Sequence, residues 1–541
     1  MTATFAQAAH DITAIKHIII VTQENRSFDH YFGHLPDYWQ AHNFPQATNG
    51  TTFDGEPATA SNLDPTRAAV NAYNLQTGCT ENPSPSWRES HRDRNRWNPE
   101  DSNNATMDGF VVTAAGDALD SHGNPALYDV LGHRAMGYFT GDGQLNYYYF
   151  MASTFATSDS WFAPVMSRTQ LNRMYLYGAT SEGHVTPLPN GSAHLTSKTI
   201  FELMQDNGIS WKIYVHPDST GCATPSCLAK YSYLNQFTYN SFVLNNLPNQ
   251  FAPTAQLMSD IQNGSLPQVS FLEPAGYVGL DEHSNDTDIL KPPSVQTGAN
   301  YIAGIVNTLM SSPSWKDTVL ILTYDEPGGF YDHVPPQQAM PPDSFQYPVD
   351  PPSPGACAGD STDPVCGFFF TGFRVPVIVI SPFTKANFVS HLPMDYTAML
   401  KLIETRFKLP SLTARDAAQP DMSQEFFDFV KVPWATPPSD VPTQDRSMQC
   451  VLGALSGITV SPNPAPAGGP ATVTLNLSKA AIQDMTVALS ADSPGVVPPS
   501  AVIGNNTSST AFNITVPTGI TSLTITGAIG GIPLSGTVPV Q

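Results

Sequence analysis

The chain has 541 residues, 41% of them hydrophobic, which is enough for two or three domains with large cores. It carries 24 Lys and Arg against 46 Asp and Glu, a formal net charge of −22, although only 13% of its residues are charged. Such a chain does not attract nucleic acid or an anionic membrane through long-range fields, so we expect no nucleic-acid partner.

The six cysteines predict disulfides and therefore an oxidising compartment. Two pairs lie close in sequence, within 222–227 and 357–366, in short loops rich in Gly, Pro and Ser. By elimination, Cys79 would join Cys450. A zinc site is the alternative, but the CxxC spacing and companion histidines that zinc favours are missing.

The N-terminal segment lacks the charged and apolar regions of a signal peptide, so we expect the mature form of a secreted or periplasmic protein. No apolar run approaches the ~20 residues needed to span a bilayer.

Short β-branched runs predict buried parallel strands that end in polar residues. They lie at 15–25, 210–217, 267–274, 317–326 and 375–382. Helical patterns separate them, for example at 300–310 and 395–407. This alternation predicts an α/β fold with a doubly wound, mostly parallel sheet and helices on both faces. Ligands bind beyond the carboxyl ends of the strands in such sheets.

Two of these strands end in acids and an amide: Glu24-Asn25 after the first run and Asp325-Glu326 about 300 residues later. Burying such groups is costly unless a cation compensates them. Hard oxygen ligands of this kind suit Ca²⁺, Mg²⁺, Mn²⁺ or, with help from histidine, Zn²⁺. The alternative is that each acid caps a loop or faces solvent.

Two hydroxyl groups, those of Ser167 and Thr169, precede a helical pattern in "MSRTQLNRMYLYGATSEGH". A hydroxyl there can cap the helix and face an anion held by free N–H groups. A divalent cation would help the Thr169 hydroxyl to lose its proton and attack phosphorus. The alternative is that Thr169 is only an N-cap.

Histidines are candidates for protonating a leaving group or contacting phosphate. The candidates are His91, His216, His283 and His333. His216 and His283 each follow a predicted strand, so we expect them at the carboxyl edge of the sheet, where the acids also lie. Each of them could instead be a surface or packed residue.

The composition changes near residue 432. We predict a catalytic domain at 1–432, a Pro-rich linker at 433–455 and a β-module at 456–541. In the last segment Thr, Val and Ile alternate with polar residues, and turns recur every eight to twelve residues. This pattern is typical of an all-β, Ig-like sandwich. We expect it to be a spacer or attachment module.

Several motifs in the first domain resemble a known family. They are "ENRSFDHYFG", "MDGF", "MGYF", "TQLNRMYLYGAT", "SPSWKDTVLILTYDEPGGFYDHVPP" and "GFRVPVIVISPF", in order between about residues 12 and 430. They resemble the bacterial phosphoesterase family that contains non-zinc phospholipases C and periplasmic acid phosphatases. The family's alkaline-phosphatase-like α/β sandwich agrees with the architecture predicted above.

The resemblance implies a set of metal ligands. By position these are Glu24, Asn25, Asp325 and Glu326, with Thr169 as fifth ligand and nucleophile.

It also implies that Asn25, His91, His216 and His283 act on the phosphoryl group, with His91 and His283 matching better than His216. Of these, Asn25, His91 and His283 would contact the substrate. The chain departs from the family around the nucleophile, where Ser167-Arg168 and Leu171 replace Gly-Pro and Pro, so Ser167 remains a second candidate. Pro327 after the Asp-Glu pair is also unexpected.

We therefore expect a metal-dependent phospholipase C that hydrolyses phosphatidylcholine-type lipids through a phosphothreonine, as a monomer that makes peripheral contact with membranes. An acid phosphatase that hydrolyses soluble phosphomonoesters is the alternative. A third alternative is a metal-binding surface or adhesion protein that has no catalytic activity.

Overall fold

The computed structural model describes residues 11–117, 129–189, 194–217, 221–284, 294–350, 356–359 and 361–541. Its larger body is built on an eight-stranded sheet in the order β13-β6-β12-β11-β1-β10-β8-β9. The strands are β1 (His17–Gln23), β6 (Ala156–Ser158), β8 (Trp211–Val215), β9 (Phe251–Pro253), β10 (Val269–Leu272), β11 (Thr318–Tyr324), β12 (Val377–Ile380) and β13 (Phe388–Ser390).

The sheet is mostly parallel, as predicted. Strands β11, β1, β10, β8 and β9 pair in parallel, whereas β12 runs antiparallel to both β11 and β6. All five predicted strands are present in this sheet.

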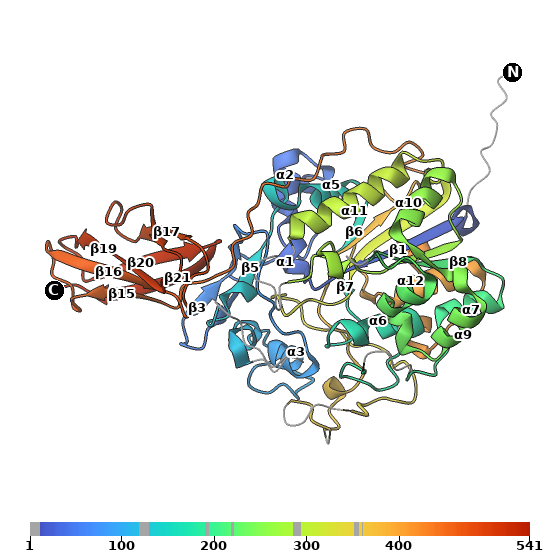
Figure 1. The fold of residues 1–541 in the computed structure, drawn as a ribbon, viewed down its shortest axis with the longest axis horizontal. Coiled ribbons are helices and arrows are strands. Elements are labelled where there is room, and N and C mark those ends of the chain that lie inside the picture. The colour runs from blue at the N-terminus through green and yellow to red at the C-terminus, as the bar shows by residue number, and fades with distance from the viewer. Residues whose placement is uncertain are drawn as a thin grey trace.

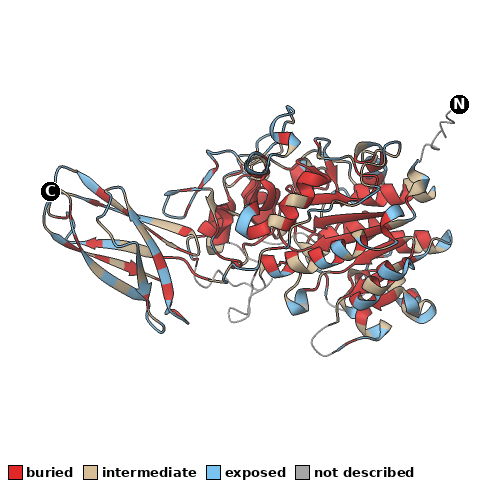
Figure 2. Cartoon of the chain, turned by 90° about the horizontal axis from the view of Figure 1, so that it is seen from above, coloured by how far each residue is buried: buried red, intermediate tan, exposed pale blue. Residues whose placement is uncertain are grey.

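Helices cover both faces of the sheet (Figure 1). On one side lie α2 (Leu35–His42), α5 (Asn146–Thr154), α10 (Thr254–Asn263) and α11 (Val295–Met310). On the other lie α6 (Thr169–Gly178), α7 (Ile200–Asp206) and α12 (Thr397–Phe407). Because both faces are covered, the central strands are buried apart from His17 at the start of β1 (Figure 2).

Shorter elements complete this body. The helices are α1 (Phe28–Phe32), α3 (Trp87–Arg94), α4 (Phe110–Val112), α8 (Pro225–Leu228), α9 (Tyr239–Asn246), α13 (Ala414–Ala417) and α14 (Met422–Glu425). The two-stranded pairs are β2 (Ser61–Leu63) with β3 (Ala69–Asn71), β4 (Tyr73–Asn74) with β5 (Gly137–Tyr138), and β7 (Trp161–Phe162) with β14 (Met394–Asp395).

The register of the two central strands places the predicted site. Strand β1 lies between β10 and β11, and Gln23 is opposite Tyr324 in the parallel pairing of β1 with β11. The next residues, Glu24-Asn25 and Asp325-Glu326, therefore leave the sheet side by side. Strand pairing thus joins segments that are about 300 residues apart.

The C-terminal region has two antiparallel sheets, β15-β16-β19 and β18-β17-β20-β21. Buried residues from both sheets form one apolar cluster, so the predicted all-β sandwich is confirmed. Its Ig-like character stays a prediction. The strands are β15 (Gly457–Ser461), β16 (Pro470–Asn476), β17 (Met485–Ala491), β18 (Ser500–Ile503), β19 (Ser509–Thr515), β20 (Ser522–Ile529) and β21 (Ile532–Pro539).

The Pro-rich segment between the two regions lies against the first region. The side-chain amide of Gln444 donates to the Gln144 carbonyl at 2.7 Å, and the Met448 N–H donates to the Gln296 side chain at 2.9 Å. The predicted disulfide between Cys79 and Cys450 forms at the end of this segment. The exact division of the chain into domains stays a prediction.

The two short-range disulfides form as well, between Cys222 and Cys227 and between Cys357 and Cys366. Three disulfides indicate an oxidising compartment. Among the described residues, no helix is both long and apolar enough to cross a membrane.

Candidate active site

The two strand ends meet in a buried cluster of carboxylates. The backbone N–H of Asn25 donates to Asp325 Oδ1 at 3.1 Å. The side chains of Glu24, Asn25, Asp325 and Glu326 are all buried. The alternative that these acids face solvent is therefore wrong, whereas the alternative that they cap loops holds in part, because the Gly328 N–H donates to Glu326 Oε2 at 2.7 Å. Their role as metal ligands stays a prediction.

The Thr169 hydroxyl reaches this cluster and donates to Glu24 Oε2 at 3.2 Å. Helix α6 begins at Thr169, and its N-cap, Arg168, makes no side-chain capping bond, so Thr169 is not the N-cap. The hydroxyl is half-buried. The Ser167 hydroxyl is buried and donates to the Val185 carbonyl at 3.2 Å. The geometry thus favours Thr169 over Ser167 as the nucleophile.

A residue that the sequence reasoning missed, Arg173, lies among these acids. One guanidinium N–H group donates to Glu24 Oε1 at 2.7 Å, and Nε donates to Asp325 Oδ2 at 3.3 Å. Burial alone lowers the pKa of Arg173, but the charges of Glu24 and Asp325 raise it well above its usual value. Arg173 is four residues after Thr169, which places both on the same face of α6. This spacing is the feature of the sequence from which Arg173 could have been identified.

One arginine does not neutralise the cluster. Burial, followed by the charge of Glu24, raises the pKa of Asp325 to about 7. Burial and the charge of Asp325 raise the pKa of Glu326 well above its usual value, and burial also raises that of Asp281. These shifts all have the direction expected for a site with excess negative charge.

Two buried oxygens of the cluster, Asn25 Oδ1 and Glu326 Oε1, have no hydrogen-bond partner in the part of the chain that the structure describes. Buried polar atoms are nearly always satisfied, so each of these points to a missing partner. Carboxylate and amide oxygens with excess negative charge fit a divalent cation. The carboxylates of Glu24, Asp325 and Glu326 are not among the described groups of three whose ligand atoms lie within 4.8 Å of one another. Binding a cation therefore requires these side chains to shift.

The backbone at Asn25 is held in an unusual conformation. Its φ is +58°, in the left-handed region, where a residue other than glycine is uncommon. Gly328 packs on this residue so closely that an added Cβ would lie 2.5 Å from the Asn25 carbonyl oxygen. The glycine after Pro327 is thus needed to bring the two strand ends together.

Of the predicted histidines, the structure brings His283 to the cluster. Its Nε2 lies 3.0 Å from the Asn25 side-chain nitrogen. Its Nδ1 is hydrogen bonded to the Ser284 carbonyl. A carbonyl only accepts and an amide nitrogen only donates, so this network assigns the ring proton to Nδ1. The contact fixes the Asn25 amide and leaves Oδ1 as its unpartnered atom.

Two of the other three predicted histidines, His91 and His216, have no described contact with the cluster. The buried His91 has both ring nitrogens against backbone carbonyls, at 2.5 Å from Trp87 and 2.9 Å from Val365, and burial lowers its pKa. His216 lies beyond β8, two strands from β1, with Nδ1 2.8 Å from the Pro217 carbonyl. These contacts favour a packing role for His91 and give His216 no described link to Thr169.

His333 belongs to a second buried ionic cluster. Arg374 donates to Asp332 Oδ1 at 2.9 Å and to Asp29 Oδ1 at 2.8 Å, and His333 Nδ1 lies 2.7 Å from Asp29 Oδ2. Ligand atoms of Asp29, Asp332 and His333 come within 4.8 Å of one another, as a metal site would require. Burial alone lowers the pKa of His333, but its hydrogen bond to Asp29 and the charges of Asp29 and Asp332 raise it to about 9, so protonated His333 and Arg374 together compensate the two carboxylates. This cluster therefore has no need of a metal ion.

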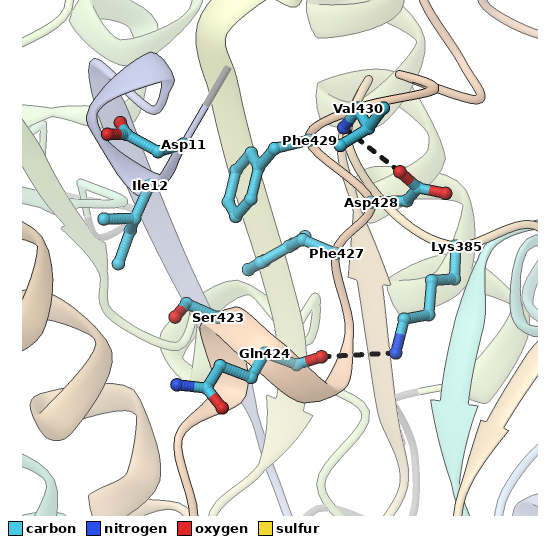
Figure 3. A pocket seen from close by; sticks show the side chains of 9 residues that line it. All are labelled: Asp11, Ile12, Lys385, Ser423, Gln424, Phe427, Asp428, Phe429 and Val430. Atoms are coloured by element: carbon cyan, nitrogen blue, oxygen red, sulfur yellow. Dashed lines mark hydrogen bonds between the residues drawn. The ribbon is translucent and has the colours of Figure 1, made fainter. Parts of the chain in front are cut away.

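A cavity of about 440 Å³ lies on another part of the molecule (Figure 3). It includes Asp11 and Ile12, which precede β1, so it is at the opposite edge of the sheet from Glu24 and Asn25. Phe427, Phe429 and Val430 give it an apolar wall. We assign it no part in the chemistry.

Comparison with known proteins shows that the chain is similar to phosphoesterases and phospholipases C. The model of the Phosphoesterase family matches residues 15–410. Phospholipase C B of Mycobacterium tuberculosis is 32% identical over 475 residues, which cover 82% of this chain and 84% of that protein. Non-specific phospholipase C1 of Arabidopsis thaliana is 29% identical over 434 residues, covering 76% and 71%.

Solved structures are more distant. A phosphonate monoester hydrolase from Silicibacter pomeroyi aligns over 73% of this chain and 84% of its own, with 10% identity and a TM-score of 0.29. A similarity this low supports no argument about fold or function.

Proposed function

The chain belongs to the Phosphoesterase family, and from this premise we propose that it is a secreted or periplasmic, metal-dependent phospholipase C. Its substrate would be the phosphodiester of phosphatidylcholine-type lipids, and it would act as a monomer. The observation that carries this proposal is the contact between Thr169 Oγ1 and Glu24 Oε2, because it joins a half-buried hydroxyl to the carboxylate cluster.

The divalent cation in this proposal would be held by Glu24, Asn25, Asp325 and Glu326, together with Thr169. When bound, it would neutralise the excess negative charge, polarise the phosphoryl oxygens and lower the pKa of the Thr169 hydroxyl. The unpartnered Asn25 Oδ1 and Glu326 Oε1 support this assignment.

The chain's own groups then have distinct tasks. Glu24 accepts the Thr169 hydroxyl proton as Oγ1 forms a bond to phosphorus. The bond from phosphorus to the diacylglycerol oxygen breaks in line, and that oxygen takes up a proton. His283 is the candidate donor and must then carry a proton on Nε2, the nitrogen that faces Asn25. Water next attacks the phosphothreonine, which releases phosphocholine and restores the hydroxyl.

Two other features stabilise the charge that moves through these steps. The first N–H groups of α6, which begins at Thr169, are available to a phosphoryl oxygen. Arg173 keeps Glu24 and Asp325 in place beneath the nucleophile. Preorganised groups of this kind supply most of the rate in phosphoryl transfer.

The test is release of phosphocholine from phosphatidylcholine, measured beside hydrolysis of p-nitrophenyl phosphate, with and without a chelator. We expect phosphocholine release that the chelator abolishes and a divalent metal restores. Faster hydrolysis of the monoester would instead identify an acid phosphatase. No turnover of either substrate across added metals would support a non-catalytic metal-binding protein and contradict the proposal.

Access to a lipid substrate requires contact with a membrane surface. Met340, Phe345 and Val349 are exposed by 52%, 43% and 51%. They lie between β11 and β12, in a segment that leaves the carboxyl edge of the sheet next to Asp325. Its two acids between 337 and 350, Asp343 and Asp350, are hydrogen bonded within the protein. We assign this segment to contact with zwitterionic lipid.

Substituting Phe345→Ser and Val349→Ser together tests the assignment. We expect slower hydrolysis of phosphatidylcholine vesicles and unchanged hydrolysis of a soluble short-chain phosphatidylcholine. Val430→Ser is the control, because Val430 is 72% exposed beside the cavity at the opposite edge of the sheet. Equal losses on both substrates, or an equal loss in the control, would contradict a lipid-contact role.

A further inference from the structure

The buried carboxylate of Glu282 is held by four side-chain donors from different parts of the chain. Tyr148 and Gln23 donate to Oε1 at 2.5 and 3.1 Å, and Tyr31 and Tyr324 donate to Oε2, both at 2.8 Å. The donors come from β1, α1, α5 and β11. Each carboxylate oxygen accepts two bonds, so the ionised form has its acceptor positions filled.

Burying the Glu282 carboxylate in this position is energetically unfavourable for the fold. Burial raises the pKa of Glu282 by more than the four hydrogen bonds lower it. Its φ is +70°, a conformation that residues other than glycine rarely adopt. In α11, Gly298 provides the space, because a Cβ there would lie 2.2 Å from Glu282 Cγ. Such strain persists where surrounding contacts enforce it, and it is concentrated at functional sites.

The segment around Glu282 lies along the end of β1. Residues 280 to 283 each contact one of residues 23 to 26. The Leu280 carbonyl accepts from Gln23 Nε2 at 3.0 Å, and the Asp281 carbonyl accepts from the Glu24 N–H at 3.0 Å. The Glu282 carbonyl accepts from Arg26 Nε at 3.1 Å, and His283 Nε2 lies 3.0 Å from Asn25 Nδ2.

We infer that Glu282 is a positioning residue for phosphoryl transfer: its four-donor cage fixes the segment 280–284 so that His283 stays against Asn25. This inference rests on the proposed function. Glu282 is remote from the reacting atoms and acts through His283 and Asn25. Losing one donor lets the segment shift, and a misplacement of about 1 Å can lower a rate by about 100-fold.

Tyr148→Phe is the mildest test, because it removes one hydroxyl and keeps the ring. Tyr149→Phe is its matched control. Tyr149 is the next residue of α5, is equally buried, and donates to the Phe139 carbonyl at 2.9 Å instead of to Glu282. We expect Tyr148→Phe to lower kcat for phosphatidylcholine about tenfold while KM is nearly unchanged, and Tyr149→Phe to leave both unchanged.

Glu282→Gln and Glu282→Ala extend the test. Glutamine keeps the shape and part of the hydrogen bonding, so we expect it to recover much of the kcat that alanine loses. Glu282→Ala leaves four buried donors without their acceptor and so also threatens folding, which is why the comparison of Tyr148→Phe with Tyr149→Phe decides the question. Equal kcat in wild type, Tyr148→Phe and Glu282→Gln would overturn the inference, as would equal losses in Tyr148→Phe and its control.

Amide hydrogen exchange separates failure of this inference from failure of the proposed function. We expect Tyr148→Phe to speed exchange in residues 280–284 without lowering the melting temperature below that of Tyr149→Phe. If wild type hydrolyses neither ester, the proposed function fails, and the positioning of catalysis by Glu282 fails with it. If wild type is active and exchange in 280–284 is the same in both variants, only the role of Glu282 is refuted.

Discussion

The first domain contains two buried ionic clusters that look alike in composition and differ in balance. Around Arg374, the carboxylates of Asp29 and Asp332 are both hydrogen bonded to the guanidinium. Around Arg173, one guanidinium serves Glu24 and Asp325, while Glu326 Oε1 has no partner among the described residues.

The difference shows that proximity of acids is a poor guide to a metal site. The Arg374 cluster has three ligand atoms within 4.8 Å of one another, yet its charges are matched. Burial also raises the pKa of Asp332, to about 6, so a raised carboxyl pKa is common to both clusters. The Arg173 cluster is more open, and two of its oxygens, Asn25 Oδ1 and Glu326 Oε1, have no hydrogen-bond partner among the described residues. Unmatched charge, more than short distance, identifies the cluster that needs a cation.

The largest effect we predict is on the nucleophile. Thr169→Ala should lower turnover by about 10⁴- to 10⁶-fold, as removal of a catalytic nucleophile does in other hydrolases, with the fold intact. Ser167→Ala is the matched variant, because it removes a nearby hydroxyl that donates to the Val185 carbonyl instead of to Glu24. Activity retained by Thr169→Ala and lost by Ser167→Ala would move the nucleophile to Ser167.

Asp325→Asn and Asp332→Asn should have opposite effects in the two clusters. Asp332→Asn breaks a buried ion pair with Arg374 and should destabilise the fold by about 3–5 kcal/mol, while the folded protein stays active. Asp325→Asn should abolish activity and destabilise the metal-free protein less, because Arg173 keeps its shorter, 2.7 Å ion pair with Glu24 when the 3.3 Å pair with Asp325 is removed. Urea unfolding and assay of the same samples would check both, and a stability loss in Asp325→Asn equal to that of Asp332→Asn would contradict the distinction.

Metal binding should stabilise the protein through the Arg173 cluster. A divalent ion at 100 times its Kd adds about 2.7 kcal/mol to the free energy of unfolding. We expect Asp332→Asn to keep this gain and Asp325→Asn to lose it, measured as the melting temperature with metal and with chelator. A gain retained by Asp325→Asn would place the ion elsewhere.

The smallest effect concerns pH. Burial alone lowers the pKa of His333, but its hydrogen bond to Asp29 and the charges of Asp29 and Asp332 raise it to about 9. The folded pKa lies above the unfolded value of about 6.5. Protonated His333 thus contributes stability that is fully present below pH 6.5 and is lost as pH rises through 9.

The stability difference between wild type and His333→Gln should therefore narrow between pH 6.5 and 9. Urea unfolding at several pH values measures it. A stability difference between wild type and His333→Gln that stays the same from pH 6.5 to 9 would show that His333 is not charged in the folded protein.

Much of the architecture could be predicted because it depends on local patterns. The β-branched runs identified the central strands, and the change in composition identified the C-terminal sandwich. The polar residues Glu24-Asn25 and Asp325-Glu326 were recognisable because each pair follows such a run. Their pairing across about 300 residues depends on the register of β1 with β11, which strand patterns do not encode.

The supporting residues could not be predicted, because their roles come from tertiary contacts. In "DEHSND", Glu282 reads as a surface acid, and nothing in its neighbourhood indicates three tyrosines from distant elements. His91 stands among charged residues in "SWRESHRDR", which suggests an exposed helix, whereas the helix buries it against Val365.

If the proposed function is right, the cluster of Glu24, Asn25, Asp325 and Glu326 binds a divalent cation next to Thr169. Elemental analysis of the purified wild type, Asp325→Asn and Asp332→Asn tests it most directly. We expect one divalent ion per chain in wild type and in Asp332→Asn, and none in Asp325→Asn. Full phosphocholine release from a wild-type protein that contains no metal would contradict it.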